Sequence, residues 1–245
     1  MKNSFSKLVP SFLPDSALHI WQIAIDSTIP PSWLEVLSED EHQRMSRLRQ
    51  DRDKHRFGIS RSALRFILAA YLNDKPDAIA FSYSQSGKPS LTNGRLQFSV
   101  SHSHDLALVA LARSKPVGVD IEYPREDVEV DELSSRFFSI SENGALQRLP
   151  TSERRAAFFR IWTAKEAFIK ATGDGLSCPL TSFDVLLDGE GDPNLAAIRP
   201  DRIEKKLWTM RNLRLPDPYV GAVVTLGETE PPQLVEIRKS TLSEE

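Results

Sequence analysis

The sequence predicts an α+β protein in which strands cluster and two long helices lie between them. Runs rich in β-branched and aromatic residues occur at 18–25, 96–100, 106–112 and 117–121, and such runs are typical of strands. Helical periodicity extends from about 38 to 72 and again from 152 to 172, and the remaining predicted strands follow the second helix. This order is not the regular strand–helix alternation of a parallel sheet, so an α+β fold is favoured.

In the first half, Ser38 and Glu41 form a capping-box signature at the start of the helical region. We expect this region to be interrupted near Asp51 and to end before the Lys-Pro pair at 75–76. A strand at "AIAFSYS" and a turn-rich loop, "SGKPSLTNG", follow. The "SHSHD" segment then predicts a turn between the strands at 96–100 and 106–112.

The second half begins with the strand at 117–121 and continues into a polar, irregular segment at 124–150 that contains the short element "SSRFFS". The second long helix ends at Gly173 and Gly175. Four further strands are expected at "SFDVLL", "KKLWTM", "YVGAVVTL" and "QLVEIR". Because a helix-plus-strands set recurs loosely in both halves, we expect two similar subdomains, 1–115 and 116–245.

Composition excludes several classes of protein. The chain has 245 residues, a net charge of -3 and a pI near 6.0, which argue against general nucleic-acid binding. Its single cysteine, Cys178, permits neither an intrachain disulfide nor a cysteine-based metal site, and this fits a reducing compartment. The N-terminus "MKNSFSKLVPSFLPDS" does not read as a signal peptide, and no apolar run is long enough for a membrane span. A cytoplasmic protein is therefore expected.

Two carboxylates stand out in the strand "VGVDIE". Because side chains alternate along a strand, Asp120 and Glu122 share one face with Gly118, opposite Val119 and Ile121. Two carboxylates on one face repel each other, and they suit a shared hard cation such as Mg²⁺. A solvated acidic face explains the same pattern, so the strand alone leaves both interpretations open.

The second long helix adds a basic and acidic cluster. Lys165 falls in the middle of the apolar stripe of this helix, while Glu166 and Lys170 lie one turn apart beside that stripe. An i,i+4 ion pair explains Glu166 and Lys170, but a lysine in an apolar stripe either extends to the surface or meets an anion. This helix face next to a carboxylate strand suits a metal–diphosphate site, with Glu166 as a third metal ligand.

An excess of positive charge lies in the first helical region. Its basic residues are Arg44, Arg47, Arg49, Arg52, Lys54, Arg56, Arg61 and Arg65. This set is either a solvated helix face or an anion site for phosphate. Ser101 and His102, in the "SHSHD" region, offer hydroxyl and imidazole donors that could also bind phosphate.

Four motifs together resemble the 4′-phosphopantetheinyl transferases. They are "GKP" at 87–89, "FSVSHS" at 98–103, "VGVDIE" at 117–122 and "FFRIWTAKEAFIKATGDGL" at 158–176. "RFFS" at 136–139, followed by Glu142, matches the middle segment of that family. The length of the chain and its N-terminal half look like the surfactin-synthetase type rather than the half-length holo-acyl-carrier-protein synthase type.

The resemblance implies two α/β subdomains around a pseudo-twofold axis, with coenzyme A in the cleft between them. It implies Mg²⁺ bound by Asp120, Glu122 and Glu166, with Lys165 and Lys170 near the diphosphate. The other implied contacts to coenzyme A come from Ser101 and His102 at the phosphates, Lys88 and Pro89 along the adenine, and Arg44 with Arg56 at the 3′-phosphate. Some family members carry a basic residue at the position of Glu41, so this chain departs from the pattern near the 3′-phosphate.

The resemblance further implies transfer of 4′-phosphopantetheine from coenzyme A to a serine of an apo acyl or peptidyl carrier protein, by a monomer. Glu166 is the expected general base, with Asp120 and Lys170 as its catalytic partners. Phe137 and Phe138 either dock the carrier or belong to the core. Two other classes of protein compete with a transferase: a non-catalytic module that binds coenzyme A or a carrier, and a metal-dependent hydrolase of diphosphates.

Overall fold

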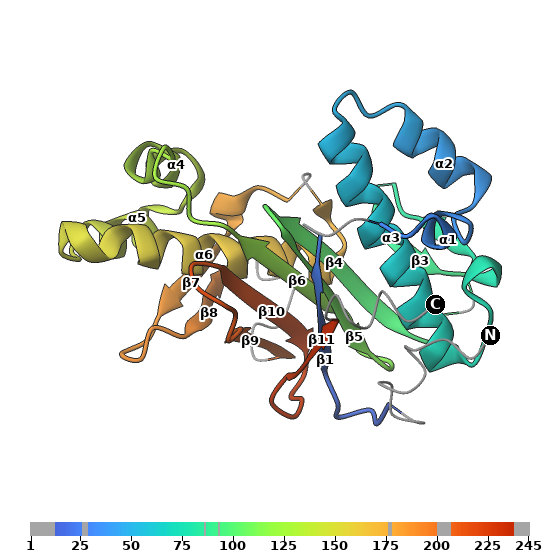
Figure 1. Ribbon diagram of the computed structural model, residues 1–245. Coiled ribbons are helices and arrows are strands. Elements are labelled where there is room, and N and C mark those ends of the chain that lie inside the picture. The colour runs from blue at the N-terminus through green and yellow to red at the C-terminus, as the bar shows by residue number, and fades with distance from the viewer. Residues whose placement is uncertain are drawn as a thin grey trace.

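The computed structural model describes residues 13–25, 29–85, 87–92, 94–175, 178–199 and 207–237 (Figure 1). The first half contains β1 (His19–Ala24), α1 (Pro31–Leu34), α2 (Glu39–Ser46), α3 (Asp51–Leu72), β2 (Phe81–Tyr83), β3 (Pro89–Leu91), β4 (Gln97–Ser103) and β5 (Leu106–Ala112). The second half contains β6 (Val117–Glu122), α4 (Val130–Phe137), α5 (Ile140–Gln147), α6 (Thr151–Thr172), β7 (Phe183–Leu187), β8 (Pro193–Ile198), β9 (Trp208–Asn212), β10 (Val220–Leu226) and β11 (Gln233–Ile237). The expected α+β class is confirmed.

Two larger sheets form the centre of the molecule. One has the strand order β11-β1-β5-β4, and the other has the order β6-β10-β9. Every pairing in these sheets is antiparallel except that of β1 with β11. The hairpin of β4 and β5 pairs Ser103 with Leu106, and His104 in its turn has a positive φ of 51°.

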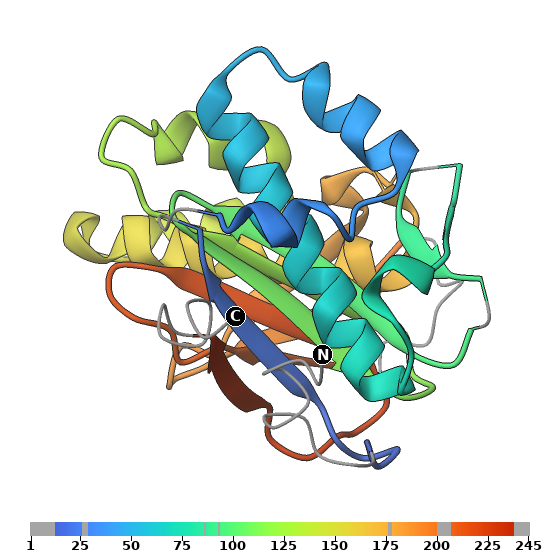
Figure 2. The ribbon, with the colours of Figure 1, turned by 45° about the vertical axis from the view of Figure 1, so that its right-hand side comes forward.

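The sheets and the two long helices form four layers. One face of the first sheet packs against α3, through Trp21, Ile23 and Val109 on the sheet and Ile67 on the helix; Figure 2 shows α3 lying across this sheet. The other face meets the second sheet in a separate apolar cluster. The far face of the second sheet packs against α6. Each sheet therefore buries both faces, and the alternating hydrophobic sets of its strands divide between two cores.

The contact between β6 and α6 is unusually close at Gly118. A Cβ atom at this position would lie 1.9 Å from the backbone oxygen of Ala167 and 2.4 Å from the backbone nitrogen of Ala171. Only glycine allows this approach. The carboxylate-bearing face of β6 is thereby held directly against the helix that carries Glu166 and Lys170.

The segment 124–150 is more regular than the sequence analysis predicted. It folds into α4 and α5, joined at Ser139. A capping box begins α5: the Ser139 hydroxyl accepts from the backbone N–H of Glu142, and the Glu142 carboxylate accepts from the backbone N–H of Ser139. The same signature was recognised at Ser38 and Glu41, but at Ser139 it was hidden in a polar, low-periodicity stretch.

The strand pairing crosses the expected division of the chain. The sequence predicted a strand at "QLVEIR", and its described part forms β11, but this strand pairs with β1 of the first sheet rather than with the second half. An additional strand, β8, pairs with β7 and was not predicted. Part of the expected strand "KKLWTM" lies outside the described residues, and Trp208 begins β9.

Among the described helices, none has the length and apolar character needed to cross a membrane. The N-terminal stretch on which the signal-peptide argument depends lies mostly outside the described residues, since the described part begins at Leu13.

Candidate active site

The centre of the site is Asp120, on the face of β6 that meets α6. Its side chain is buried, and its Oδ1 accepts hydrogen bonds from Ser101 Oγ and from Lys170 Nζ, both at 2.7 Å. The Lys170 ammonium also donates to Ser101 Oγ at 2.8 Å. The strand β4, the strand β6 and the helix α6 thus each contribute one member of a compact polar triangle.

Two further carboxylates lie around Asp120. Burial raises the pKa of Glu122 on β6 above its ordinary value, and the Asp120 charge raises it further. Burial also raises the pKa of Glu166 on α6, again with the Asp120 charge adding to the effect. Three half-buried or buried acids in mutual repulsion favour a proton or a cation among them.

The donor set fits a hard divalent cation. Asp120 Oδ2 is buried and has no hydrogen-bond partner among the described residues, so one carboxylate oxygen is left over inside the site. Oxygen donors of this kind are those that Mg²⁺ uses, together with substrate phosphate and water. Across the described part of the chain, however, no three such side chains already stand in metal-binding arrangement. Lys170 lies among them and takes the other oxygen of Asp120.

A basic cavity of about 440 Å³ opens on the other side of β4. Arg44, Arg56, His102 and Pro89 are among its lining residues. His102 lies within β4 rather than in the turn where the sequence analysis placed it, because the strand continues to Ser103. Burial lowers the pKa of His102, and the nearby charges of Lys170 and Arg56 lower it further, so a neutral imidazole faces this cavity. Arg56 also reaches Asp105, with 3.3 Å between Nη2 and Oδ1.

The Gly-Lys-Pro loop connects the basic cavity to α6. Lys88 and Pro89 line a smaller cavity of about 230 Å³ together with Lys170. Lys88 Nζ donates to the backbone oxygen of Lys170, and burial lowers the pKa of this lysine. The loop is therefore tied to the C-terminal end of the helix that carries Glu166.

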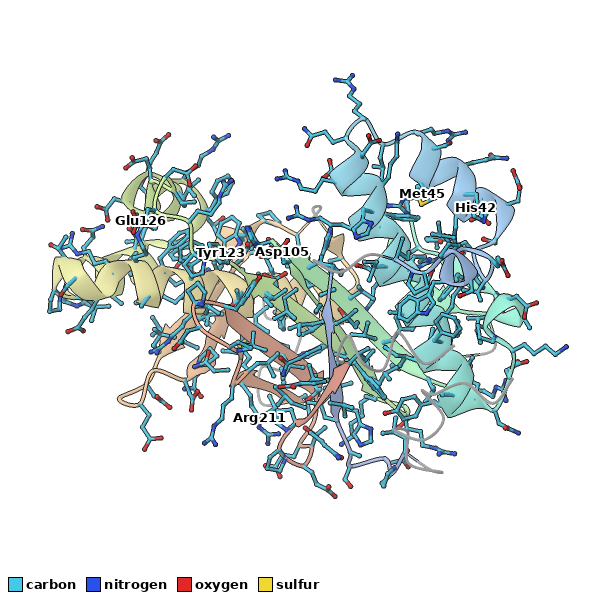
Figure 3. All side chains as sticks on the ribbon, in the orientation of Figure 1. His42, Met45, Asp105, Tyr123, Glu126 and Arg211 are labelled. Atoms are coloured by element: carbon cyan, nitrogen blue, oxygen red, sulfur yellow. The ribbon has the colours of Figure 1, made fainter. Side chains whose placement is uncertain are left out.

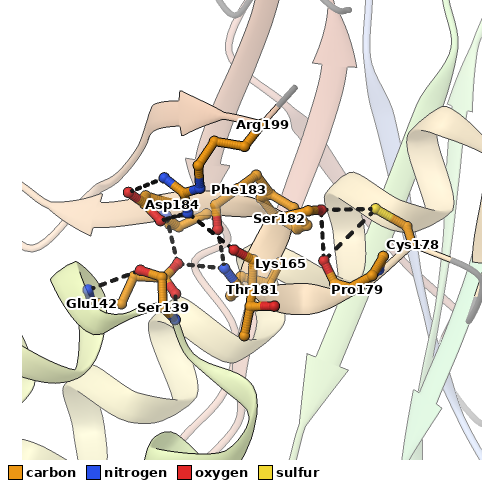
Figure 4. Close-up of polar contacts among 11 residues, drawn as sticks. Ser139, Glu142, Lys165, Cys178, Pro179, Thr181, Ser182, Phe183, Asp184 and Arg199 are labelled. Atoms are coloured by element: carbon orange, nitrogen blue, oxygen red, sulfur yellow. Dashed lines mark hydrogen bonds and ion pairs between the residues drawn. The ribbon is translucent and has the colours of Figure 1, made fainter. Parts of the chain in front are cut away.

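Lys165 is placed differently from its expected position near a diphosphate. It is fully buried on the opposite side of α6, where its Nζ lies 2.5 Å from Glu142 Oε1 and 2.6 Å from the backbone oxygen of Phe183 (Figure 4). The anion that it meets is a protein carboxylate in the core. This corrects the earlier assignment: Lys165 lies in the apolar stripe of α6, and that stripe faces α5 and β7 rather than β6.

Glu41, where some family members carry a basic residue, is also held in a buried ion pair within the protein. It is the N3 residue of a capping box that begins α2, and it is buried. Its carboxylate is bonded to Arg61 and to Arg65, the latter at 2.7 Å. Burial raises the pKa of Glu41, but the two guanidinium groups more than offset this, so the net shift is downward. Arg61 and Arg65, two of the basic residues noted in the sequence, are thus neutralised within the protein.

A second cavity, of about 410 Å³, adjoins Glu122. Its lining includes Arg52, Arg56, Tyr123 and Trp162. Figure 3 shows the labelled Tyr123 close to Asp105, between α4 and the N-terminal end of α3. The ring of His104 stacks on Tyr123, with centroids 4.6 Å apart. One wall of this cavity is therefore aromatic and another is basic.

The two phenylalanines of "RFFS" belong mainly to the core. Phe138 is buried and stacks on Phe158, with ring centroids 5.1 Å apart. Phe137 is partly buried and meets Trp162 edge to face at 5.8 Å. Ile140 beside them is 96% exposed. Of the two interpretations of this element, the structure favours core packing for both phenylalanine rings.

Sequence reasoning missed Ser103. Its Oγ donates to Glu122 Oε2 at 2.9 Å and accepts from the backbone N–H of Tyr123 at 3.0 Å. The signal was present in the alternation of "SVSHS", which places Ser99, Ser101 and Ser103 on one face of a strand. The role of these serines becomes evident only in the structure, where β6 packs against that face.

Comparison with known proteins matches the chain to one family. The sequence profile of the 4′-phosphopantetheinyl transferase superfamily matches residues 116–224, and that of the N-terminal region of 4′-phosphopantetheinyl transferase matches residues 30–114. The chain is 34% identical over 219 residues to the 4′-phosphopantetheinyl transferase HetI of Nostoc sp., covering 86% of this chain and 88% of that protein. It is 32% identical over 165 residues to Sfp of Bacillus subtilis, covering 66% of this chain and 72% of that protein.

A chain with this fold, these profiles and these relatives belongs to the 4′-phosphopantetheinyl transferase superfamily. It is an enzyme of the Sfp-like type, a 4′-phosphopantetheinyl transferase. The expectation drawn from the four sequence motifs is confirmed at this level. The non-catalytic binding module is therefore set aside.

Proposed function

We propose that this enzyme transfers the 4′-phosphopantetheine group of coenzyme A to a serine hydroxyl of an apo acyl or peptidyl carrier protein. The products are the holo carrier and 3′,5′-ADP. The observation that supports this most is the buried, unpartnered oxygen of Asp120, with Lys170 on one side and two more carboxylates nearby. A diphosphate is a substrate group that binds both a divalent cation and a lysine.

Asp120, Glu122 and Glu166 would hold Mg²⁺. When bound, Mg²⁺ would neutralise charge on the diphosphate and polarise its phosphoryl oxygens. The raised pKa values of Glu122 and Glu166 and the unpartnered Asp120 oxygen support this assignment, because they indicate more negative charge in the site than Lys170 alone balances. Lys170, which bonds Asp120 Oδ1 in this structure, would turn toward the diphosphate, and Asp120 Oδ2 is the oxygen that would face the cation.

We assign the remaining contacts to coenzyme A from the residues that line the cavities. His102, neutral and facing the basic cavity, would donate to a phosphate. The proton of the Ser101 hydroxyl is donated to Asp120 Oδ1, so we do not propose that Ser101 donates to a phosphate as well. Arg44 and Arg56 line the same cavity and would bind the 3′-phosphate. Lys88 and Pro89 would lie along the adenine, at the edge that joins this cavity to α6. Lys165 takes no part in this binding site.

The proton of the carrier serine would pass to Glu166, directly or through a water molecule. The serine oxygen forms a bond to the β-phosphorus of coenzyme A, and the bond from that phosphorus to the bridging oxygen breaks. The electron pair leaves with 3′,5′-ADP. Glu166 is partly buried on α6 and close enough to Asp120 for the two charges to interact, which places a carboxylate beside the reacting groups. Lys170 lies close enough to Asp120 to stabilise the leaving diphosphate oxygen as well.

We propose also that one chain suffices for activity and that the enzyme acts in the cytoplasm. Two related halves, divided near residue 115, would provide the two sides of the cleft, with β11 returning to the first sheet. In support, the basic cavity is lined by the first half, while Glu122 and Glu166 come from the second.

Mass spectrometry tests the proposed function. The protein is mixed with Mg²⁺, coenzyme A and a set of apo carriers from fatty acid, polyketide and nonribosomal peptide systems. We expect at least one carrier to gain a phosphopantetheine group and 3′,5′-ADP to appear in equal amount. Hydrolysis of coenzyme A, with no carrier modified, would favour the diphosphate hydrolase instead.

A further inference from the structure

We propose that Ser103 is a positioning residue that, with Ser101, sets which oxygen of each β6 carboxylate faces the metal. This inference rests on the proposed Mg²⁺ site. No step of the transfer described above uses Ser103, and no contact with substrate is needed for its role. It acts through Glu122.

The serines lie on a seam between the two large sheets. β4 and β6 belong to different sheets, so they do not share a backbone ladder. The backbone N–H of Val119 instead donates to Ser99 Oγ at 3.1 Å, and the N–H of Tyr123 donates to Ser103 Oγ at 3.0 Å. The hydroxyl groups of Ser99 and Ser103 therefore take the place of missing backbone acceptors at two points along this edge.

The direction of each serine hydrogen bond is fixed by its neighbour. A backbone N–H can only donate, so the Ser103 oxygen must accept from Tyr123 and its own proton is available for Glu122 Oε2 at 2.9 Å. Ser101 is in the same position, because the Lys170 ammonium can only donate to it and its proton goes to Asp120 Oδ1. Both hydroxyls therefore act as donors to a carboxylate, and neither can reverse without losing a bond.

One oxygen of each carboxylate is thereby occupied. Asp120 is held through Oδ1, and its Oδ2 is the buried atom with no partner among the described residues. Glu122 is held through Oε2, so the serine leaves Oε1 for a cation. Because a hydrogen bond to one oxygen fixes the orientation of the carboxylate plane, the two serines preorganise the ligands before the metal arrives.

The seam supplies a matched control for this role. Ser99 accepts the backbone N–H of Val119 in β6, and Ser103 accepts that of Tyr123, the residue after β6. Of the two serines, only Ser103 also donates to a carboxylate. Ser99→Ala and Ser103→Ala therefore remove the same kind of structural hydrogen bond. They differ in the contact to Glu122, and Ser103→Thr restores the hydroxyl.

The experiment measures Mn²⁺ binding to the full chain, with and without coenzyme A. Binding is detected as a loss of the electron paramagnetic resonance signal of the free ion. Asp120→Asn serves as the metal-site control. We expect Ser103→Ala to weaken Mn²⁺ binding by about tenfold, the effect of a hydrogen bond to a charged group. Ser99→Ala should bind Mn²⁺ as the wild type does, although its melting temperature falls, and Ser103→Thr should recover most of the loss.

Equal Mn²⁺ affinities for Ser103→Ala and Ser99→Ala would overturn the role of Ser103 and leave the metal site intact. A wild type that binds Mn²⁺ no better than Asp120→Asn would overturn the proposed metal site itself, and this inference with it. The Mg²⁺ concentration at half-maximal transfer gives an independent check, since it should rise for Ser103→Ala and not for Ser99→Ala.

Discussion

The helices α3 and α6 share a structural framework, a buried ion pair at the same position, but they differ in function. Each has 22 residues, and in each the fifteenth residue is a buried cation, Arg65 in α3 and Lys165 in α6. Each cation meets a buried glutamate, Glu41 or Glu142, that is the N3 residue of a capping box on a short helix. Each also donates to the backbone of the segment that follows its helix: Arg65 to two carbonyl oxygens and Lys165 to one.

The difference lies in the neighbouring positions. In α6 the residues after Lys165 include Glu166 and Lys170, which turn toward Asp120. The corresponding residues of α3 are Phe66 and Ala70, which pack in the core of the first half. A buried ion pair and a reactive carboxylate can thus occupy adjacent positions of one helix, because neighbouring residues point to different faces. The ion pair fixes the helix, and its neighbours carry the chemistry.

The largest expected effect is on transfer activity, and it comes from a change at Asp120, which faces the reactive side of α6. Asp120→Asn should reduce transfer by about a thousandfold or more, since one preorganised charge for the transition state is lost. Its melting temperature should stay near that of the wild type, because the amide keeps the bond from Ser101. Transfer is measured by phosphopantetheinylation of an apo carrier. Transfer within tenfold of the wild type would contradict the role of Asp120.

The next effect tests the framework position. Lys165→Met should lower the free energy of unfolding by about 3–5 kcal/mol, because Glu142 would be left as an unpaired buried charge. Adding Glu142→Leu should recover much of that loss. Urea unfolding measures both variants, with Arg65→Met as the matched change in α3. A Lys165→Met protein of full stability and abolished transfer would place Lys165 at the diphosphate after all.

The two halves should also respond in opposite ways to pH. The lowered pKa of Glu41 means that its ionised form stabilises the fold above its unfolded-state pKa, and this stabilisation is lost as pH falls through the folded-state value. The raised pKa of Glu166 has the reverse effect, since ionisation costs stability as pH rises from the unfolded-state value through the folded-state value.

Calorimetry without added metal measures this contrast. At neutral pH, Glu41→Gln should melt lower than the wild type and Glu166→Gln higher, and both differences should shrink on acidification below pH 4. A Glu166→Gln protein that melts lower than the wild type at neutral pH would show that Glu166 is part of the framework. The contrast between the two faces of α6 would then fail.

The smallest effect concerns the basic cavity beside α3. His102→Gln should raise the KM for coenzyme A by about three- to tenfold, the worth of a neutral hydrogen bond to a charged group, with little change in kcat. Arg95→Gln serves as an exposed basic control that does not line the cavity. An unchanged KM for coenzyme A would remove His102 from the phosphate contacts.

Much of the fold was accessible from the sequence because its strongest elements obey simple periods. The alternation of Val117, Val119 and Ile121 with Asp120 and Glu122 predicted β6 and the grouping of its carboxylates. The apolar stripe of α6 predicted that Lys165 would either extend to the surface or meet an anion, and the structure shows an anion. Which anion it meets was not accessible, because Glu142 lies 23 residues away in a segment with weak periodicity.

Pairing between distant segments was equally hidden. The return of β11 to β1 and the seam of serines along β6 depend on how the sheets stack. No local sequence pattern predicts how the two sheets stack. Ser103 therefore emerged from the structure, whereas Ser101 and His102 were proposed from a motif.

The most direct test of the account is a crystal structure with Mn²⁺ and coenzyme A. We predict one anomalous peak bounded by Asp120 Oδ2, Glu122 and Glu166, with the diphosphate completing its shell and Lys170 shifted onto a phosphate oxygen. Lys165 should remain bonded to Glu142. A peak elsewhere, or a diphosphate bound by Lys165, would contradict the division of α6 into a framework face and a reactive face.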